Sequence, residues 1–574
     1  MVILVIAVTV FVLLPLAAFA QASLGIETGA ATGLGTRDLK EIIAAVVRII
    51  LGFLGIIAVI IIIYGGYTWM TAAGNEDKIK DAKRILVNAV IGLAIILAAF
   101  GIVSYVIARL SEATREPVEE PGRDRGGFEG GLGALGGGIL SSVYPEPGAN
   151  DVPRNTLIMV TFKEEMDAST IIESQNRPAA CQNFPEGITC GYLKASGDEP
   201  TVRIINRSQD NQVLGADEVV AVTADNRNFV FDPVQYLGSP DGTTDYSINL
   251  TDQLDKKSGA PAFLIGGYTW SFQVSAVLDL TPPQLESVIP VSPPAVPKNT
   301  IVQFNFNEAV NVLTATGQAT GNPDEGLKTI LISYKDGENN LHYVTGQATI
   351  SNRFRTVEFV SDLACEVNGQ PVEENSCGVR PTCFPGNEEI TALIKAAMVD
   401  QSGNTTDIFS GITDAAANSF DGNNNGQAEG QPADNFSSTF TTTDAVDLTP
   451  PEAISINPEQ GSDIVPKNSA IKAQFNERLR SATLNSENFT VFEFACNGPA
   501  FPQNLSCYPE GGFSVYKEEG NNQTKAVLKT YYPYLNPLTI YNPRLTAGIQ
   551  DLYQNCFKPA IGPCADGQVS PGCQ

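Results

Sequence analysis

The chain has 574 residues, which at about 150 residues per domain corresponds to about four structural units. Hydrophobic residues make up 43% of it, enough to bury real cores, so a disordered chain is excluded. A single histidine, His342, argues against histidine-based catalysis and histidine-rich metal sites. The net charge is -27, and the first 110 residues hold eight basic and six acidic residues, so the negative charge lies beyond them. This charge repels phosphate backbones and argues against nucleic acid as a partner.

Residues 1–20 are uncharged and end in Ala18-Phe19-Ala20, the small-x-small pattern that precedes a secretory cleavage site. We therefore expect residues 1–20 to be a signal peptide that is cleaved before Gln21. The basic residues that usually open such a segment are missing, so an uncleaved anchor or a start further upstream is the alternative.

Two longer uncharged stretches, residues 49–75 and 85–108, can each cross a bilayer as a helix. The run GIIAVIIIIY in the first stretch has no polar face, which argues against a soluble hairpin. The intervening loop, residues 74–84, carries four basic residues, and the positive-inside tendency places it in the cytoplasm. We expect residues 38–110 to form a transmembrane hairpin in a bacterial cell membrane, with the C-terminal region outside the cytoplasm.

The first predicted helix ends in YGGYTWM at residues 64–70, and the second opens with ILVNA at residues 85–89. With the signal segment and the basic loop, these features resemble the small pilin family of type IV secretion and conjugation systems, over about residues 20–110. The resemblance implies that both ends of the hairpin face the outside of a filament and that the hairpin self-associates. Such pilins usually end soon after the second helix, whereas this chain continues for more than 460 residues.

A glycine-rich segment follows the hairpin. Residues 117–138 hold nine glycines among 22 positions, with charges and no apolar periodicity. This composition is typical of a flexible tether, and we assign residues 111–138 to a linker.

Beyond the linker the chain repeats itself three times without gaps. Each repeat opens with the motif V-P-R/K-N-T/S and has a phenylalanine ten residues and a glutamate twelve residues after the opening valine. The sequence DLTPP, at residues 279–283 and 447–451, precedes the second and third repeats, and its double proline stiffens each joint. The landmark residues are Val152, Phe162 and Glu164; Val296, Phe306 and Glu308; and Val465, Phe475 and Glu477.

Apolar and polar residues alternate within the repeats, which predicts half-buried strands. The predicted strands are residues 157–162, 201–205, 268–274, 301–306 and 436–441. Many short strands separated by turn signals are typical of antiparallel β-sandwiches.

The repeat openings, PEPG at residues 145–148 followed by the V-P-x-N-T motif and EEMD at residues 164–167, resemble the bacterial Ig-like domains of S-layer and other surface proteins. We therefore expect a mainly β fold, with three tandem Ig-like antiparallel β-sandwiches preceded by a signal segment and a two-helix transmembrane hairpin. The predicted modules span residues 139–278, 279–446 and 447–574. The third lacks a closing strand, so either its Cys-rich tail replaces that strand or the chain is a fragment.

All ten cysteines lie beyond residue 180, on the predicted outer side, where disulfides persist. Cys181 and Cys190 in the first repeat occupy positions equivalent to Cys496 and Cys507 in the third, which predicts two short-loop disulfides. The pairing of the other six stays open, and zinc is the alternative for these clusters, although no C-x-x-C supports it. The six are Cys365, Cys377, Cys383, Cys556, Cys564 and Cys573.

A candidate calcium loop lies in the second repeat. Asp421, Asn423, Asn425 and Glu429 occupy positions 1, 3, 5 and 9 of an EF-hand-type loop that has glycine at position 6. Pro432 stands at position 12 instead of a bidentate glutamate, so we expect a weak site, suited to millimolar calcium outside cells. A plain Asn/Gly-rich turn is the alternative.

The repeated glutamates admit two readings. A carboxylate just past a strand commonly caps a turn, and this is the reading we adopt. The alternative is that Glu164, Glu308 and Glu477 are calcium ligands between domains.

We find no catalytic motif and expect no enzyme activity and no cofactor other than calcium. The sequence predicts a membrane-anchored cell-surface protein that displays Ig-like modules for adhesion to an unknown extracellular protein or glycan. One alternative is a structural or minor subunit of a type IV secretion pilus with Ig-like decoration. A more distant one is a surface hydrolase with Ig-like spacers, since composition does not exclude a carboxylate pair.

Overall fold

The computed structural model describes residues 80, 83, 84 and 135–559, except 176, 183, 264, 265, 292, 463, 494–507, 510 and 533. Contacts divide the chain into two compact units, Met1–Pro121 and Gly122–Gln574, and the second contains all three β modules. The predicted signal peptide and both predicted membrane spans lie outside the described residues.

Within the described residues, no helix is long and apolar enough to cross a membrane. Lys80, Lys83 and Arg84, from the predicted basic loop, are exposed and helical. The predicted connecting segment is therefore helical at these three residues, which agrees with the strong helix propensity of lysine and arginine.

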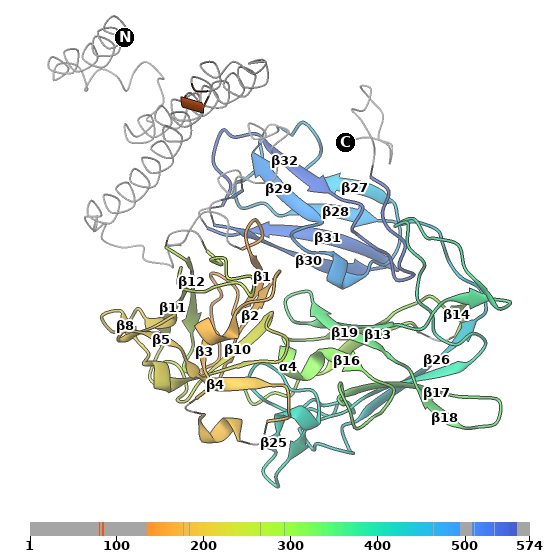
Figure 1. Ribbon diagram of the computed structural model, residues 1–574, viewed down its shortest axis with the longest axis horizontal. Helices are drawn as coiled ribbons and strands as arrows, with labels where there is room; N and C mark the ends of the chain where they lie inside the picture. Colours follow the sequence, from red (N-terminus) through yellow and green to blue (C-terminus); the bar gives the residue numbers. More distant parts are fainter. Residues whose placement is uncertain are drawn as a thin grey trace, which may run out of the picture. The chain divides into compact units, whose positions relative to one another are not determined.

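The first module is a sandwich of two antiparallel sheets, drawn in orange to yellow-green in Figure 1. The larger sheet has the order β1-β2-β10-β9-β4-β3, the smaller has the order β12-β11-β7-β8, and β5 and β6 form a hairpin. The strands are β1 (Leu140–Tyr144), β2 (Ile158–Phe162), β3 (Ile172–Glu173), β4 (Thr189–Leu193), β5 (Ala195–Ser196), β6 (Glu199–Pro200), β7 (Val202–Asn206), β8 (Gln212–Val213), β9 (Val219–Thr223), β10 (Asn228–Pro233), β11 (Thr244–Leu250) and β12 (Tyr268–Val274). Three 3₁₀ turns complete the module: η3 (Ala168–Thr170), η4 (Ala179–Cys181) and η5 (Ala216–Glu218).

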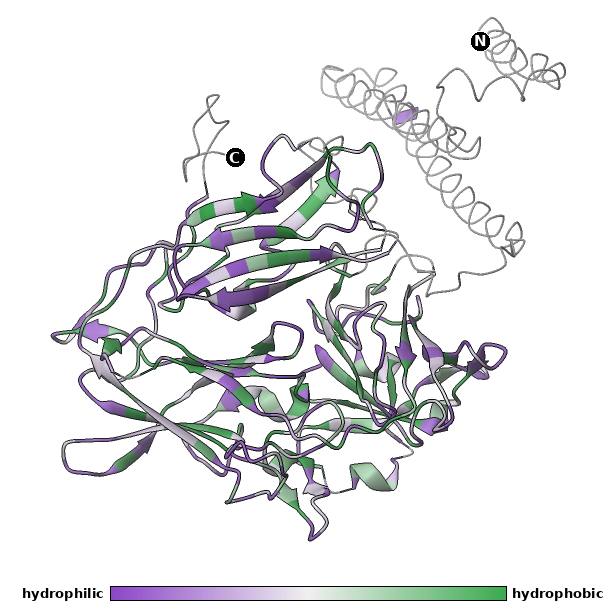
Figure 2. Cartoon of the chain, turned by 180° about the vertical axis from the view of Figure 1, so that it is seen from behind, coloured by the Kyte–Doolittle hydropathy of each residue, from purple (hydrophilic) through white to green (hydrophobic). Residues whose placement is uncertain are grey.

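The core of the first module forms between its two sheets. Phe162 of β2, Phe229 of β10 and Trp270 of β12 belong to one buried cluster. The indole Nε1 of Trp270 donates a hydrogen bond to the carbonyl oxygen of Pro145 at 2.9 Å, which satisfies its buried N–H group. Figure 2 shows the alternation of apolar and polar residues as bands along the strands. This is the half-buried pattern that the sequence predicts.

Leu135 corrects the predicted end of the linker. We assigned residues 111–138 to a flexible segment, but Leu135 is 1% exposed and pairs with Leu140. The carbonyl oxygen of Leu135 also accepts a hydrogen bond from the backbone of Phe513 in the third module. Gly136 and Gly137 lie so close to Phe513 and Tyr508 that a side chain would not fit there. These two glycines therefore serve close packing, whereas the composition alone suggests flexibility.

The second module is a sandwich of two five-stranded sheets, green to cyan in Figure 1. Their orders are β13-β15-β20-β19-β16 and β14-β26-β23-β17-β18, and two further hairpins pair β21 with β22 and β24 with β25. The elements are β13 (Leu285–Ile289), β14 (Val296–Pro297), β15 (Val302–Phe306), α4 (Val312–Ala315), β16 (Gly317–Ala319), β17 (Ile330–Lys335), β18 (Leu341–Tyr343), β19 (Gly346–Ser351), β20 (Thr356–Ser361), β21 (Glu366–Val367), β22 (Gln370–Pro371), β23 (Glu389–Ile394), β24 (Met398–Val399), β25 (Thr405–Asp407), η6 (Ile408–Ser410) and β26 (Phe436–Thr443).

The third module is smaller and is blue in Figure 1. It has a four-stranded sheet, β27-β28-β31-β30, and the pair β29-β32. The elements are β27 (Ala453–Asn457), β28 (Ile471–Phe475), η7 (Ser481–Thr483), β29 (Phe489–Glu493), β30 (Phe513–Gly520), β31 (Gln523–Thr530) and β32 (Tyr541–Leu545). Phe475 is fully buried in its core, at the position of Phe162 and Phe306 in the other modules.

The opening motifs of the first and second repeats pair with the closing strands of their own modules. Val152 forms a parallel bridge with Val274 of β12, and β14 pairs in parallel with β26. In the described part of the third module no strand takes this position, and Val465 is 37% exposed.

Apolar and polar contacts join neighbouring modules within the second unit. Met159 and Val222 of the first module share a buried cluster with Val312 and Phe354 of the second. Ile301 of the second module packs with Leu552 of the third. The three modules therefore bury part of their cores against one another.

Candidate functional site

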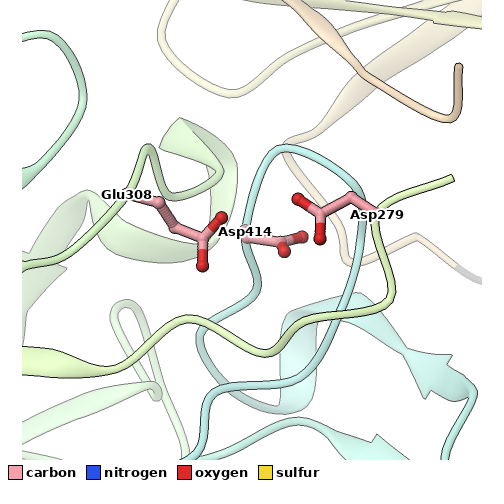
Figure 3. A group of neighbouring side chains, drawn as sticks. All are labelled: Asp279, Glu308 and Asp414. Atoms are coloured by element: carbon pink, nitrogen blue, oxygen red, sulfur yellow. The ribbon is translucent and has the colours of Figure 1, made fainter. Parts of the chain in front are cut away.

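Three carboxylates meet at the joint between the first and second modules. Asp279 belongs to the DLTPP linker, Glu308 follows β15, and Asp414 lies in the loop after η6. Each offers an oxygen atom, and these atoms all lie within 4.8 Å of one another. Figure 3 shows the three side chains converging from three separate segments. Carboxylate oxygens gathered in this way are the ligands that calcium prefers.

Two asparagines position the aspartates of this joint. Asn155, from the opening motif of the first module, donates from Nδ2 to the carbonyl oxygen of Asp279 and accepts from its backbone N–H, both at 2.8 Å. The Nδ2 of Asn418 donates to the carbonyl oxygen of Asp279 at 3.2 Å and to Oδ2 of Asp414 at 2.8 Å. The linker is therefore held to both modules at the point where the carboxylates meet.

The carboxylates of this joint repel one another. Burial, followed by the charges of Asp414 and Asp279, raises the pKa of Glu308 to about 8, although the charge of Arg355 lowers it. Burial is also the main cause that raises the pKa of Asp414 to about 7, and the charge of Asp279 adds to it. A positive charge placed among them would stabilise the ionised carboxylates.

At the joint between the second and third modules, the same asparagine hydrogen bonds recur around Asp447 and Asp551, the counterparts of Asp279 and Asp414. Asn299 donates to the carbonyl oxygen of Asp447 at 2.7 Å and accepts from its N–H at 2.9 Å. Asn555 donates to the carbonyl oxygen of Asp447 at 3.1 Å and to Oδ2 of Asp551 at 2.9 Å. Burial first, then the charges of Asp551 and Asp447, raise the pKa of Glu477 to about 7.

The two aspartates of each joint were missed by the sequence analysis. A signal was nevertheless present, because I-x-D-x-x-x-N occurs at residues 412–418 and again at residues 549–555. In the second module the aspartate and asparagine of this motif are Asp414 and Asn418. In the third module they are Asp551 and Asn555. A search restricted to the opening motifs could not find it.

The repeated glutamates do not cap turns, so that interpretation is wrong. Glu164 forms an ion pair with Lys256 at 2.7 Å. Among the described residues, no backbone N–H group donates to Glu308 or Glu477. These two carboxylates remain available to a ligand.

The predicted calcium-loop residues are brought together in the structure. The Oε2 of Glu429 accepts from Nδ2 of Asn423 at 3.0 Å and from Nδ2 of Asn425 at 2.7 Å. Asp421 is fully buried, and its Oδ2 accepts from the backbone of Gly426 at 2.7 Å. Hydrogen bonds within the folded loop therefore connect the residues that the sequence spacing predicts as ligands.

Asp434 is the residue of this loop that the sequence analysis missed. It is fully buried, and its Oδ1 accepts from Nδ2 of Asn423 at 2.7 Å. The loop template places the last ligand at position 12, which is Pro432, whereas the structure brings in the acidic residue two positions later. The four predicted residues offer carboxylate and amide oxygens as ligands, and Asp434 adds a further carboxylate. Oxygen ligands of this kind fit a hard cation such as calcium.

The structure shows three disulfides in the part of the chain that it describes. Cys181 pairs with Cys190, as predicted from the sequence. Cys365 pairs with Cys383, and Cys377 of the second module pairs with Cys556 of the third, so for these four residues disulfide replaces the zinc alternative. The remaining four cysteines lie outside the described residues: Cys496, Cys507, Cys564 and Cys573.

The two-sheet modules are β-sandwiches, an architecture consistent with Ig-like domains, and comparisons with known proteins agree with both resemblances found in the sequence. Residues 35–106 match the family model of type IV secretion system pilins. Residues 447–561 match the model of a bacterial Ig-like domain. No curated protein sequence matches the chain.

The solved structures with detectable similarity include an S-layer protein and repeats of a large adhesion protein. The S-layer protein SbsC is 12% identical with a TM-score of 0.16, and the match covers 85% of this chain and 63% of that one. A tetra-tandem repeat from the extending region of a large adhesion protein is 10% identical with a TM-score of 0.13, covering 69% of this chain and 70% of that one. This chain therefore spans less than two thirds of the S-layer structure.

Proposed function

We propose that the chain is a membrane-anchored bacterial cell-surface protein that displays its Ig-like modules for adhesion. The observation that carries the proposal is the presence, in one chain, of a pilin-like segment at residues 35–106 and of disulfide-bonded Ig-like modules. Disulfides persist in oxidising compartments outside the cytoplasm. Two uncharged stretches in the pilin-like segment are long enough to anchor the chain in a membrane.

One hollow between the modules is smaller than a typical small-molecule site. A hollow of about 180 Å³ lies between Thr161 and Lys163 of the first module and Asn485 and Glu487 of the third. Pockets for small molecules are typically about 300–1,000 Å³. An extracellular protein or glycan that contacts exposed loops is therefore the partner that we propose.

We further propose that calcium binds the loop of residues 421–434. The buried carboxylates of Asp421 and Asp434, with Glu429 near Asn423 and Asn425, support this proposal. Removing one carboxylate by Asp434→Asn should weaken calcium binding to this loop, measured by titration calorimetry. An unchanged affinity would contradict the site.

A second candidate function is that of a structural or minor subunit of a type IV secretion pilus. The match of residues 35–106 to the pilin family favours it, since a pilus subunit has to pack against other copies. The two candidates differ in whether the hairpin only anchors the modules or also packs against other copies.

Electron microscopy distinguishes the two candidates. The full-length protein is extracted from its native membrane and viewed by negative staining, with an antibody against the Ig-like modules as label. The anchored adhesin predicts label on the cell envelope and no labelled filaments. Labelled filaments with a regular repeat would instead show a pilus subunit.

Protease treatment of intact cells tests surface display itself. If the modules lie outside, an added protease should remove the antibody signal without lysis, as it does for a known surface protein. Protection of the modules until the envelope is broken would refute surface display for both candidates.

A further inference from the structure

The strand registers show that one position has changed its charge between repeats. Isolated bridges pair Met166 with Lys256 in the first module, Val310 with Asp414 in the second and Leu479 with Asp551 in the third. Met166, Val310 and Leu479 each stand fourteen residues after the opening valine. Lys256, Asp414 and Asp551 are therefore structurally equivalent.

In the first module, this position supplies the positive charge that faces the repeated glutamate. The Nζ of Lys256 lies 2.7 Å from Oε1 of Glu164. The stretch of the sequence that corresponds to the DLTPP linkers, residues 131–138, contains no acidic residue. The glutamate of the first module is thus paired within its own module.

In the second and third modules the lysine is replaced by aspartate, and the preceding linker adds another aspartate. At the first joint, oxygen atoms of Asp279, Glu308 and Asp414 lie within 4.8 Å of one another, where the first module has an ammonium group. At the second joint, the charges of Asp551 and Asp447 act on Glu477 in the same sense. Three carboxylates that share one place require a cation for all to be ionised. The chain offers aspartate where it offered lysine before, and the charge of Arg355 only partly offsets the repulsion at Glu308, so a cation from solution would complete the charge balance.

We propose that each joint between modules binds one calcium ion, held by Asp279, Glu308 and Asp414 at the first joint and by Asp447, Glu477 and Asp551 at the second. Both sets consist of oxygen ligands of the type that calcium selects. They are separate from the loop of residues 421–434 and do not depend on membrane anchoring or adhesion.

An unpaired buried oxygen at the second joint points independently to a ligand. Asn555 is fully buried, and its Oδ1 has no hydrogen-bond partner. Its Nδ2 donates to the carbonyl oxygen of Asp447 and to Oδ2 of Asp551, so the amide group lies at the cluster. Buried polar atoms are nearly always satisfied, and a calcium ion would satisfy this oxygen as a further ligand.

Binding at these positions would connect neighbouring modules. Asp279 is held by Asn155 of the preceding module, whereas Glu308 and Asp414 belong to the following one. A cation shared by the three therefore ties the linker to the second module and should protect the joint from proteolysis.

The repeated glutamates provide three matched variants in the full-length protein. Glu308→Gln and Glu477→Gln each remove one ligand charge without breaking a hydrogen bond that the structure shows. Glu164→Gln makes the same change at the equivalent position of the first module, where Lys256 supplies the positive charge. Circular dichroism in chelator confirms that each variant is folded.

Calcium titration calorimetry on chelator-treated protein measures the number of ions bound and their affinities. Glu308→Gln and Glu477→Gln should each abolish one binding event or weaken it by about tenfold or more, and Glu164→Gln should leave binding unchanged. The double variant should also lose calcium protection of the DLTPP linkers against protease. The proposal is overturned if the double variant binds as many calcium ions as the wild type with the same affinities.

Discussion

Glu358 is the residue whose replacement tests the packing of the second module against the third most directly. It lies on β20 and is fully buried. Its carboxylate accepts hydrogen bonds from the backbone N–H groups of Ser481 and Ala482, at the start of η7 in the third module, and from Nε2 of Gln303. Gln303 in turn accepts from Nζ of the buried Lys517 at 2.9 Å. One carboxylate thus connects two modules.

Replacing Glu358 by alanine removes the acceptor for two backbone N–H groups and a negative charge near Lys517. Removing one partner of a buried charged network costs about 3–5 kcal/mol. Because 1.4 kcal/mol corresponds to a tenfold change in an equilibrium constant, the joint should open on the order of a hundred to several thousand times more often. Glu358→Gln keeps one acceptor oxygen and should cost about 1–3 kcal/mol.

Hydrogen exchange followed by mass spectrometry measures this opening at peptides that contain Ser481 and Ala482. Exchange at η7 should accelerate strongly in Glu358→Ala and moderately in Glu358→Gln. The strands in the core of the first module should keep their wild-type exchange rates, since they do not contact this network.

Glu389→Gln is the matched control, because Glu389 is an exposed carboxylate on β23 of the same module. Its exchange pattern should equal that of the wild type. If Glu358→Ala leaves exchange at η7 unchanged while the protein stays folded, the proposed interface between the two modules is refuted.

Three further outcomes follow from the structure. Cleavage in the linker of residues 447–451 should leave two fragments joined until reductant is added, because the Cys377–Cys556 disulfide crosses that joint. Separation of the fragments on a non-reducing gel would exclude this disulfide. In chelator, the stability of the second module should fall as pH rises from about 4.5 to about 8, since the pKa of Glu308, which faces Asp279, Asp414 and Arg355, is raised in the folded state to about 8. Glu308→Gln should flatten this pH dependence of the unfolding midpoint. Trp270→Ala should destabilise the first module by about 3–5 kcal/mol in urea unfolding, with Tyr236→Ala, an exposed aromatic, near zero.

The repeat pattern predicts much of the β architecture correctly. The predicted strand at residues 268–274 is β12 with the same bounds, and those at 157–162 and 301–306 contain β2 and β15. This success has a local cause, because side chains alternate between the two faces of a strand and the pattern is visible in a few consecutive residues. The Cys181–Cys190 disulfide is predicted from a different signal, the equivalent placing of cysteines in the first and third repeats.

The loop of residues 421–434 shows where local reasoning ends. Asp421, Asn423, Asn425 and Glu429 follow a spacing that can be recognised in the sequence, and the structure brings them together. Asp434 joins them outside the template spacing, because the backbone between Glu429 and Asp434 turns so that the amides of Glu429 and Gly430 donate to its carboxylate.

Module type and redox pairing over short loops are thus encoded in patterns of neighbouring residues. The acidic joints are not, because Asp279 and Asp414 lie 135 residues apart in the sequence and the long Cys377–Cys556 link spans 179 residues. Folding places these groups side by side through strand pairing and module packing, which involve contacts that no local window contains. The same packing decides whether a repeated glutamate meets a lysine, as in the first module, or two aspartates, as in the second and third.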